Sequence, residues 1–454
     1  MIPRVVIAGT SSGAGKTTVA CGIIGALRAR GMTVQGFKVG PDYIDPSHHA
    51  LASGRPGRNL DAFLSGPELI APLVRHGSAG ADIAIVEGVM GLFDGASGRG
   101  ELASTAHVAK LLGAPVVLVL DAAAMARSAA AMVHGFRTFD PAVQVAGVIF
   151  NKVGSDTHEQ LLREALAGSG LPVLGALRRD ARVVTPERHL GLVPVAEREH
   201  DARAALGALA AAMERYADLD ALAQLARSAP ATPGPAWSPA AERPVAPGPR
   251  IAIARGPAFS FHYQENLELL QGAGAELVGV DPLRDETLPE DCGALVLAGG
   301  FPEVFGAELA ANAPLKAQVA AFAASGRPVL AECGGLLYLG RDLDGHEMCG
   351  VLPARGAMSG RLTLGYREAV ATTATPWLTA GTAVRGHEFH YSKVERGEPG
   401  TSPAWQLSTR SFTRPEGLVR DNVQASFLHV HWAAHPGLAQ AFARAAAAQP
   451  AVVS

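Results

Sequence analysis

The chain has 454 residues, of which 48% are hydrophobic and 18% are charged, and its formal net charge is -3. At about 150 residues per domain, this length predicts two or three domains. The composition supports buried cores and excludes a largely disordered chain. A nearly neutral chain also lacks the basic field of a dedicated nucleic-acid binder, so we expect no nucleic-acid partner.

Nothing in the sequence predicts membrane insertion or secretion. The apolar run at 111–120 is bracketed by Lys110 and Asp121 and is far shorter than the roughly 20 residues of a membrane span. The chain runs from Met1 into an expected strand, without the features of a signal peptide. Its four cysteines are too few and too irregular for a disulfide framework or a zinc site. We therefore expect a cytoplasmic protein with no membrane partner.

A proline-rich stretch at 228–249 divides the chain. It holds seven of the 31 prolines and has the composition of a stiff, extended linker. On both sides of it, short apolar runs alternate with helical stretches, which is the pattern of α/β domains. The expected strands lie at 5–8, 83–86, 116–120 and 145–150 in the first part, and at 251–254, 277–280, 294–297 and 329–331 in the second.

We therefore predict an α/β protein of two domains. A P-loop domain with a parallel sheet occupies 1–227, and the proline-rich linker follows it. A second α/β domain, with a more strand-rich stretch from about 351 to 428, occupies 250–440. Residues 441–454 are predicted to be a C-terminal tail.

A phosphate-binding loop follows the first expected strand. Residues 9–18 read GTSSGAGKTT and lie between a strand and a helix, where backbone N–H groups can surround a phosphate. The loop is a variant, because Thr10 stands where the usual spacing has a glycine. Lys16 is expected to reach the β- and γ-phosphates, and Thr17 to ligate Mg²⁺. The expected nucleotide-binding residues are Gly13, Gly15, Lys16, Thr17 and Thr18.

Acidic residues near this loop are candidates for metal binding and catalysis. Glu87 ends a buried strand, at the edge where α/β sheets bind ligands, and is the best candidate for a metal carboxylate. Asp42, Asp45 and Asp94 lie in short loops rich in glycine or proline, where an aspartate is by default a turn former. Asn151 follows the strand at 145–150, and either contacts the base of a nucleotide or simply ends the strand.

The second part contains a candidate nucleophile. Residues 328–339 read PVLAECGGLLYL, which predicts a strand, a sharp turn at Cys333 and a helix. A turn at a helix N-terminus is expected to lower the pKa of the thiol and to offer N–H groups to an oxyanion. The other three cysteines lack this setting.

A base for this cysteine is expected on a late strand at 425–432. His429 and His431 lie two residues apart and therefore on the same face of that strand. A purely structural role for these histidines remains an alternative. His387 and His390 are not at the spacing of a helical zinc motif, so we predict no metal there, although the GHEFHYS segment can line a site.

With these residues identified, the chain resembles the cobyrinic acid or hydrogenobyrinic acid a,c-diamide synthases. The resemblance covers residues 5 to about 436. Its first half is similar to dethiobiotin synthetase and its P-loop relatives, and its second half is similar to class I glutamine amidotransferases of the cobyric acid synthase type. The motifs that carry it are GTSSGAGKT, FKVGPDYIDP, VEGVMGLFDG, AGGFPE, AECGG and GHEFHYS.

The resemblance implies amidation of the a and c carboxylates of a corrin-type acid, with ATP and Mg²⁺ as cofactors and L-glutamine as nitrogen donor. Ammonia released by Cys333 would displace phosphate from a substrate acyl phosphate. A homodimer is a family-level expectation. The implied roles are as follows: Asp45, Asp94, Cys333 and His429 in catalysis; Asp42 and Glu87 at the metal, with Thr17 from the phosphate loop; Tyr43 at the substrate; and Gly300 and Gly334 as oxyanion donors.

The chain departs from the class I pattern at one point. The usual late histidine motif supplies a carboxylate that completes a triad, whereas this chain reads His429-Val-His431. We assign His429 as the base, and what orients it remains open. Two alternatives to the implied function are a cobyric acid synthase and a regulatory P-loop ATPase with an inactive amidotransferase-like domain. The sequence does not decide whether the substrate carries cobalt.

Overall fold

The chain forms two compact units, Met1–Ser238 and Pro239–Ser454. The computed structural model describes residues 2–179, 187–188, 191–192, 195–396 and 400–448. The division at Ser238 falls inside the expected linker, and residues 228–249 contain no helix or strand. Each unit combines a parallel sheet with helices, which confirms the predicted two-domain α/β architecture.

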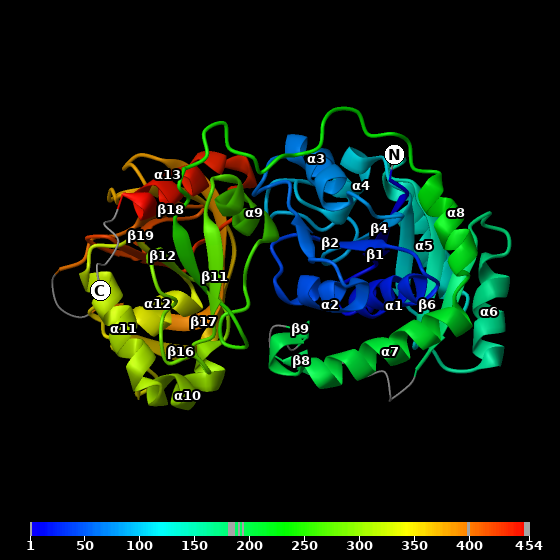
Figure 1. Cartoon of the computed structure of the whole chain (residues 1–454). Coiled ribbons are helices and arrows are strands. Elements are labelled where there is room, and N and C mark those ends of the chain that lie inside the picture. Colours follow the sequence, from blue (N-terminus) through cyan, green and yellow to red (C-terminus); the bar gives the residue numbers. More distant parts are fainter. Residues whose placement is uncertain (1, 180–186, 189–190, 193–194, 397–399, 449–454) are drawn as a thin grey trace. The chain divides into compact units, whose positions relative to one another are not determined.

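The first unit is built on a seven-stranded sheet whose neighbouring strands are all parallel (Figure 1). In spatial order the strands are β3 (Arg58–Leu60), β2 (Val34–Val39), β4 (Ile83–Glu87), β1 (Arg4–Gly9), β5 (Val116–Asp121), β6 (Val145–Val153) and β7 (Val173–Arg178). Helices on both faces bury the central strands, which explains their almost continuous apolar sequences. The four expected strands of this half are confirmed.

Helices cover this sheet on both sides. They are α1 (Lys16–Ala29), α2 (Ile44–Ser53), α3 (Pro67–Gly77), α4 (Thr105–Leu112), α5 (Ser128–Phe139), α6 (Asp156–Leu166), α7 (Glu199–Tyr216) and α8 (Leu219–Arg227). Apolar residues of α1, α7 and α8 form one core with β1, β4 and β5. A two-residue pair, β8 (Glu187–Arg188) and β9 (Gly191–Leu192), and the short helix η2 (Val195–Glu197) precede α7. Among the described residues, every helix is too short or too polar to cross a lipid bilayer.

The second unit contains a six-stranded sheet. Its order is β11 (Glu276–Val280), β10 (Arg250–Ala254), β12 (Cys292–Leu297), β13 (Val329–Glu332), β21 (Val423–Ser426) and β20 (Leu418–Arg420). All neighbours are parallel except β20 and β21. The four strands that the sequence predicts for this half are β10 to β13, and they are confirmed.

A second, mostly antiparallel sheet accounts for the strand-rich stretch of the sequence. Its strands are β14 (Asp342–Leu343), β15 (His346–Glu347), β16 (Ala354–Ala371), β17 (Ala383–Arg396), β18 (Trp405–Ser408), β19 (Thr413–Glu416) and β22 (His429–Val430). The helices of the unit are α9 (Gln264–Gly272), η3 (Pro302–Phe305), α10 (Gly306–Ala311), α11 (Ala313–Ala324), α12 (Gly334–Leu339), η4 (Trp432–Ala434) and α13 (Pro436–Ala447).

The single late strand expected at 425–432 is wrong. The structure has two strands there, because β21 ends at Ser426 in the parallel sheet and β22 joins β17 in the other sheet. Side chains explain the break: the Phe427 amide donates to Glu416 Oε1 at 2.8 Å, and the Leu428 amide donates to Ser426 Oγ at 2.8 Å. These amides therefore do not continue the β21 ladder.

The predicted tail at 441–454 also needs correction. Helix α13 continues through Ala447, and Phe442 is fully buried with its ring in edge contact with Trp377, 5.1 Å between centroids. Alanine residues on the same face of the helix are buried as well. Residues 441–447 therefore belong to a helix that packs one face on the core of the second unit.

We predict that Phe442→Ala destabilises the second unit by about 3–5 kcal/mol, because it leaves a cavity in a packed core. Unfolding followed by tryptophan fluorescence would measure this, since Trp377, Trp405 and Trp432 all lie in this unit. Arg444→Ala, on the exposed face of the same helix, is the control and should change stability by less than about 0.5 kcal/mol. A loss below about 1 kcal/mol for Phe442→Ala would contradict this assignment.

Candidate functional site

The predicted phosphate loop lies between β1 and α1, as the sequence indicates. Gly13 and Gly15 adopt φ angles of 76° and 95°, a region that glycine enters without strain. Lys16 begins α1, and its ammonium donates to the carbonyl oxygens of Ser11 at 3.1 Å and Met90 at 2.6 Å. Burial, together with the charge of Lys38, lowers the pKa of Lys16 to about 8. Thr18 is half-buried in the first turn of α1.

Asn151 lies against this loop. A Cβ atom on Gly15 would stand 2.0 Å from Asn151 Nδ2, so only glycine leaves room for the amide. That amide donates to the Ala14 carbonyl at 3.1 Å, while Asn151 Oδ1 accepts from the Lys152 amide at 2.9 Å. The structure thus gives Asn151 a role in holding the loop, and its contact with a nucleotide base stays a prediction.

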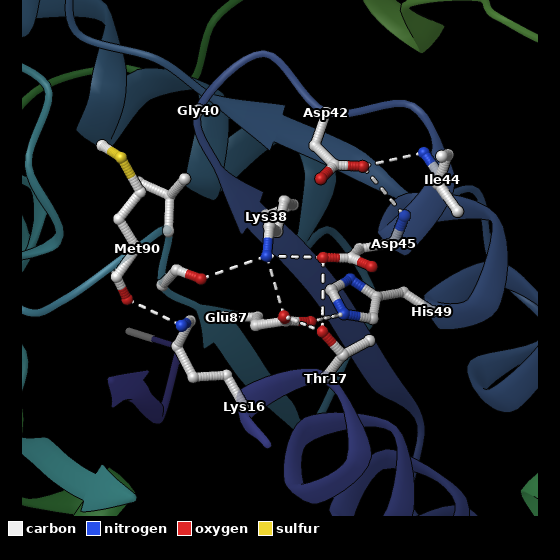
Figure 2. Close-up of polar contacts among 12 residues, drawn as sticks. Lys16, Thr17, Lys38, Gly40, Asp42, Ile44, Asp45, His49, Glu87 and Met90 are labelled. Atoms are coloured by element: carbon white, nitrogen blue, oxygen red, sulfur yellow. Dashed lines mark hydrogen bonds and ion pairs between the residues drawn. The ribbon is translucent and has the colours of Figure 1, made fainter. Parts of the chain in front are cut away.

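A buried cluster of charges lies beside the loop, at the carboxyl ends of β2 and β4. Figure 2 shows the Lys38 ammonium between two carboxylates, 2.6 Å from Asp45 Oδ2 and 2.8 Å from Glu87 Oε1. Thr17 Oγ1 donates to Glu87 Oε1 at 2.6 Å and lies 3.3 Å from Asp45 Oδ2. The other Glu87 oxygen lies 2.7 Å from His49 Nε2. Thr17, Asp45 and Glu87 are therefore brought together, as predicted.

With both carboxylates ionised, the cluster would carry more negative than positive charge. Burial alone would lower the pKa of Lys38, but the charges of Asp45 and Glu87 outweigh burial and raise it. Burial would raise the pKa of Glu87, but Lys38 and His49 hold it well below its usual range. Burial and the charge of Asp42 raise the pKa of Asp45 to about 8, against the effect of Lys38. An additional cation would favour the ionised form of Asp45.

The remaining predicted residues of this site lie around the cluster. Asp42 Oδ1 accepts from the amides of Ile44 at 2.8 Å and Asp45 at 3.0 Å, so it stabilises the first turn of α2. Tyr43 is buried immediately before that helix. Asp94 is exposed, and its Oδ2 accepts from the Gly91 amide at 3.0 Å. The turn-forming role is thus seen for both aspartates, and their metal and catalytic roles stay predictions.

Cys333 occupies a sharp turn between β13 and α12. Its φ and ψ angles are 49° and -101°, a strained conformation for a residue with a side chain. Gly335 permits the close packing of this turn, because a Cβ there would stand 2.2 Å from the Leu297 carbonyl oxygen. The predicted elbow geometry is therefore present, and all four cysteines are free thiols.

The expected depression of the cysteine pKa is wrong. Burial raises the pKa of the Cys333 thiol, and the charge of Glu303 raises it further, while the Gly334 amide opposes them. A short helix offers one favourable amide, which does not offset complete burial among carboxylates. The resting thiol is therefore protonated and needs a base.

His429 supplies an imidazole beside this turn. Its ring is fully buried, stacks on the His387 ring at 5.0 Å between centroids, and has Nδ1 3.4 Å from Glu332 Oε2. A Cβ on Gly299 would stand 2.6 Å from His429 Cε1. His431 instead packs on Tyr263 and pairs with Glu265 at 3.4 Å. The two histidines therefore do not act as one pair.

Gly300 and Gly334, the predicted oxyanion donors, approach each other. A Cβ on Gly334 would lie 3.1 Å from the Gly300 nitrogen, and a Cβ on Gly300 would lie 2.1 Å from the Ala258 carbonyl oxygen. A side chain at Gly300 would clash with the backbone of Ala258, and one at Gly334 would be tight against Pro302 and Gly300. Their backbones lie close together beside Cys333, and their role in binding an oxyanion stays a prediction.

Sequence reasoning missed three residues of these sites, Lys38, His49 and Glu332, and it did not pair His387 with His429. A lysine within the fully buried strand VQGFKV was the available signal for the first. The GHEFHYS segment was expected to line a site, and its His387 does stack on His429. Its Glu388 is paired with Arg367 and Arg414. Among the described residues, no group of three His, Cys, Asp or Glu side chains is arranged to hold a metal by itself.

Comparison with known families matches both halves of the chain. Residues 5–193 match the CobQ/CobB/MinD/ParA nucleotide binding domain, and residues 250–437 match the CobB/CobQ-like glutamine amidotransferase domain. The first unit is therefore a nucleotide-binding domain and the second a glutamine amidotransferase domain.

Curated relatives are similar to this chain over nearly their whole length. A hydrogenobyrinate a,c-diamide synthase of Streptomyces coelicolor is 57% identical over 97% of this chain and 97% of its own. One of Mycobacterium tuberculosis is 50% identical over 98% of each chain. A cobyrinate a,c-diamide synthase of Syntrophotalea carbinolica is 48% identical over 97% of this chain and 98% of its own. With this identity along nearly its whole length, the chain belongs to the family of cobyrinate and hydrogenobyrinate a,c-diamide synthases, glutamine-dependent ligases.

Proposed function

We propose that this protein converts the a and c side-chain carboxylates of hydrogenobyrinic or cobyrinic acid into carboxamides, using ATP and glutamine. One observation carries the proposal: a phosphate loop with a buried carboxylate cluster and a cysteine elbow with a buried imidazole occur in one chain. The first arrangement suits activation of a carboxylate by phosphoryl transfer, and the second suits release of ammonia from an amide. The names of the relatives supply the substrate class.

In the nucleotide-binding unit, backbone amides of the loop and the Lys16 ammonium would hold the phosphates of ATP. Lys16 donates to two carbonyl oxygens, and these bonds would exchange for phosphate oxygens. A carboxylate of the corrinoid acid then attacks the γ-phosphate, the bond from that phosphorus to the bridging oxygen breaks, and an acyl phosphate and ADP result. Ammonia displaces phosphate from the acyl phosphate and leaves the amide.

The residues present fit a magnesium ion. Thr17 Oγ1 and Glu87 Oε1 lie 2.6 Å apart beside the phosphate loop, and ionisation of Asp45 would give their cluster an excess of negative charge. Magnesium binds through one or two protein oxygens together with phosphates and water, so three acidic ligands are not needed. Bound there, the ion would neutralise charge on the β- and γ-phosphates. Thr17 and Glu87 are the proposed ligands, with Asp42 as the predicted third contributor.

In the amidotransferase unit, Cys333 would attack the carboxamide carbon of glutamine. The proton of the thiol passes to His429, and the Gly300 and Gly334 amides donate to the developing oxyanion. The C–N bond then breaks as His429 returns the proton to the leaving nitrogen. Water hydrolyses the resulting thioester to glutamate. A homodimer and a cytoplasmic location remain predictions from the sequence.

The substrate prediction is tested by mass spectrometry. Incubation of the protein with ATP, Mg²⁺, glutamine and hydrogenobyrinic or cobyrinic acid should produce two amidations, and omission of Mg²⁺ or ATP should abolish them. Relatives named for hydrogenobyrinate lead us to expect the cobalt-free acid to be preferred. Amidation of further carboxylates of the diamide would instead indicate a cobyric acid synthase. No amidation of either acid, with ATP hydrolysis unaffected by glutamine, would favour a regulatory ATPase.

We predict that Cys333→Ser separates the two half-reactions. Loss of the thiolate should lower glutamine-dependent amidation by about 1,000-fold, while amidation with added ammonium salt stays within about twofold of wild type. Cys349→Ser, which changes a half-buried cysteine of the same unit, is the matched control and should retain both activities. Glutamine-dependent activity surviving in Cys333→Ser would show that the nucleophile is another residue.

We predict that Glu87→Gln has the complementary effect. Losing a charge that Lys38, Thr17 and His49 all contact should lower amidation on the order of 100-fold with either nitrogen source. Glutaminase activity in the absence of ATP should be unchanged. Glu101→Gln, at an exposed carboxylate of the same unit, serves as the control. Equal loss of glutaminase activity in Glu87→Gln would point to a folding defect instead.

A further inference from the structure

Glu332, the residue that precedes the nucleophile, faces the proposed base. Its Oε2 lies 3.4 Å from His429 Nδ1, and its side chain is 15% exposed whereas that of His429 is fully buried. We propose that Glu332 positions His429 and stabilises the imidazolium formed when Cys333 gives up its proton. It would thereby replace the triad carboxylate that this chain lacks after its late histidine. The proposal rests on the proposed function of Cys333 and His429.

The backbone explains how a residue beside the nucleophile reaches the base. Glu332 is the last residue of β13 and pairs in register with Ser426, the last residue of β21. The chain then passes through two residues to His429 at the start of β22. The Cys333 amide donates to the Ser426 carbonyl at 2.7 Å, so the ends of the two strands are held together. The carboxylate, the thiol and the imidazole thus come from two adjacent strand ends.

Other groups fix the plane of the His429 ring. His387 stacks on it with 17° between the ring planes, and His387 Nε2 lies 2.9 Å from the Tyr263 hydroxyl. Burial lowers the pKa of His387 well below its ordinary value, and His429 adds to this effect, so His387 stays neutral. Gly299 lies close to His429 Cε1. The stacking sets the plane of the His429 ring. Glu332 then faces Nδ1, which leaves Nε2 to accept the proton of the thiol.

The protonation state of Cys333 explains why His429 needs a carboxylate beside it. The buried thiol is protonated at rest, so the S–C bond to glutamine forms as the S–H proton moves to His429. This creates a cation in a fully buried ring, and a buried cation without a counter-charge is costly. A carboxylate at Nδ1 compensates that charge in the same way as the acidic member of a catalytic triad. The proton then leaves with ammonia.

Nearby carboxylates are engaged elsewhere. Glu416 accepts from Ser426 Oγ at 2.5 Å and from the Phe427 amide at 2.8 Å. Glu388 is bound by two arginines, and Glu265 pairs with His431. Each of these carboxylates has a partner other than His429. The distance of 3.4 Å between Glu332 Oε2 and His429 Nδ1 assigns Glu332 to the base.

The test compares Glu332→Gln and Glu332→Asp with wild type and with Glu308→Gln, a control at an exposed carboxylate of the same unit. Glutaminase activity without corrinoid acid gives kcat and KM, and amidation is measured with glutamine and with ammonium salt. We expect Glu332→Gln to lower the glutaminase kcat on the order of 100-fold, with KM for glutamine within about twofold. Ammonium-dependent amidation should match wild type, and Glu332→Asp should recover part of the lost rate.

Three results would overturn the proposal. A glutaminase kcat within about threefold of wild type would show that Glu332 does not assist the base. A change confined to KM would make it a glutamine-binding residue. Parallel loss of ammonium-dependent amidation would indicate a structural role. Because the glutaminase assay needs no corrinoid acid, a wild-type protein that fails to amidate either acid would refute the substrate assignment and leave this test intact.

Discussion

Both units depend on parallel strands whose two faces are covered, so that polar chemistry is confined to the strand ends. In the nucleotide-binding unit, β1, β2 and β4 are buried along their length, and Glu87 is the last residue of β4. In the amidotransferase unit, β13 is apolar until Glu332 and Cys333. Parallel strands have their carboxyl ends at one edge, so residues far apart in sequence converge there. This constraint places both sites at the carboxyl ends of parallel strands.

At the first of these edges, the buried ammonium of Lys38 makes the carboxylate cluster possible. Glu87 and Asp45 could not both be ionised at such depth without a counter-charge. Lys38 compensates part of the negative charge of the two carboxylates. The compensation is incomplete, because the pKa of Asp45 is still raised. The cluster is thus stable enough to fold and still suited to a cation, which fits a site for magnesium and nucleotide phosphates.

At the second edge, at the end of β13, burial and nearby carboxylates disfavour the charged form of the reactive group. Cys333 is surrounded by burial and carboxylates that keep its thiol protonated. A permanently ionised thiolate in this position would be unstable, and the proton must move only when glutamine is attacked. A base with its own carboxylate, His429 with Glu332, meets this need without a separate third member on the histidine strand. The strained backbone of Cys333 holds the thiol at the end of its strand.

The sequence by itself determined the architecture, the phosphate loop, the cysteine elbow and the family. Those features are local, because each depends on residues that are close together in the sequence. Examples are the periodicity of the strands, the spacing of the glycines and the order of strand, turn and helix. It could not find the partners of Glu87 or His429, because Lys38, His49, Glu332 and His387 reach them only through strand order and register. It also misjudged the pKa of Cys333 and the continuity of residues 425–432. Burial and side-chain bonds to backbone amides decide both, and only the tertiary structure fixes which atoms are near enough to act.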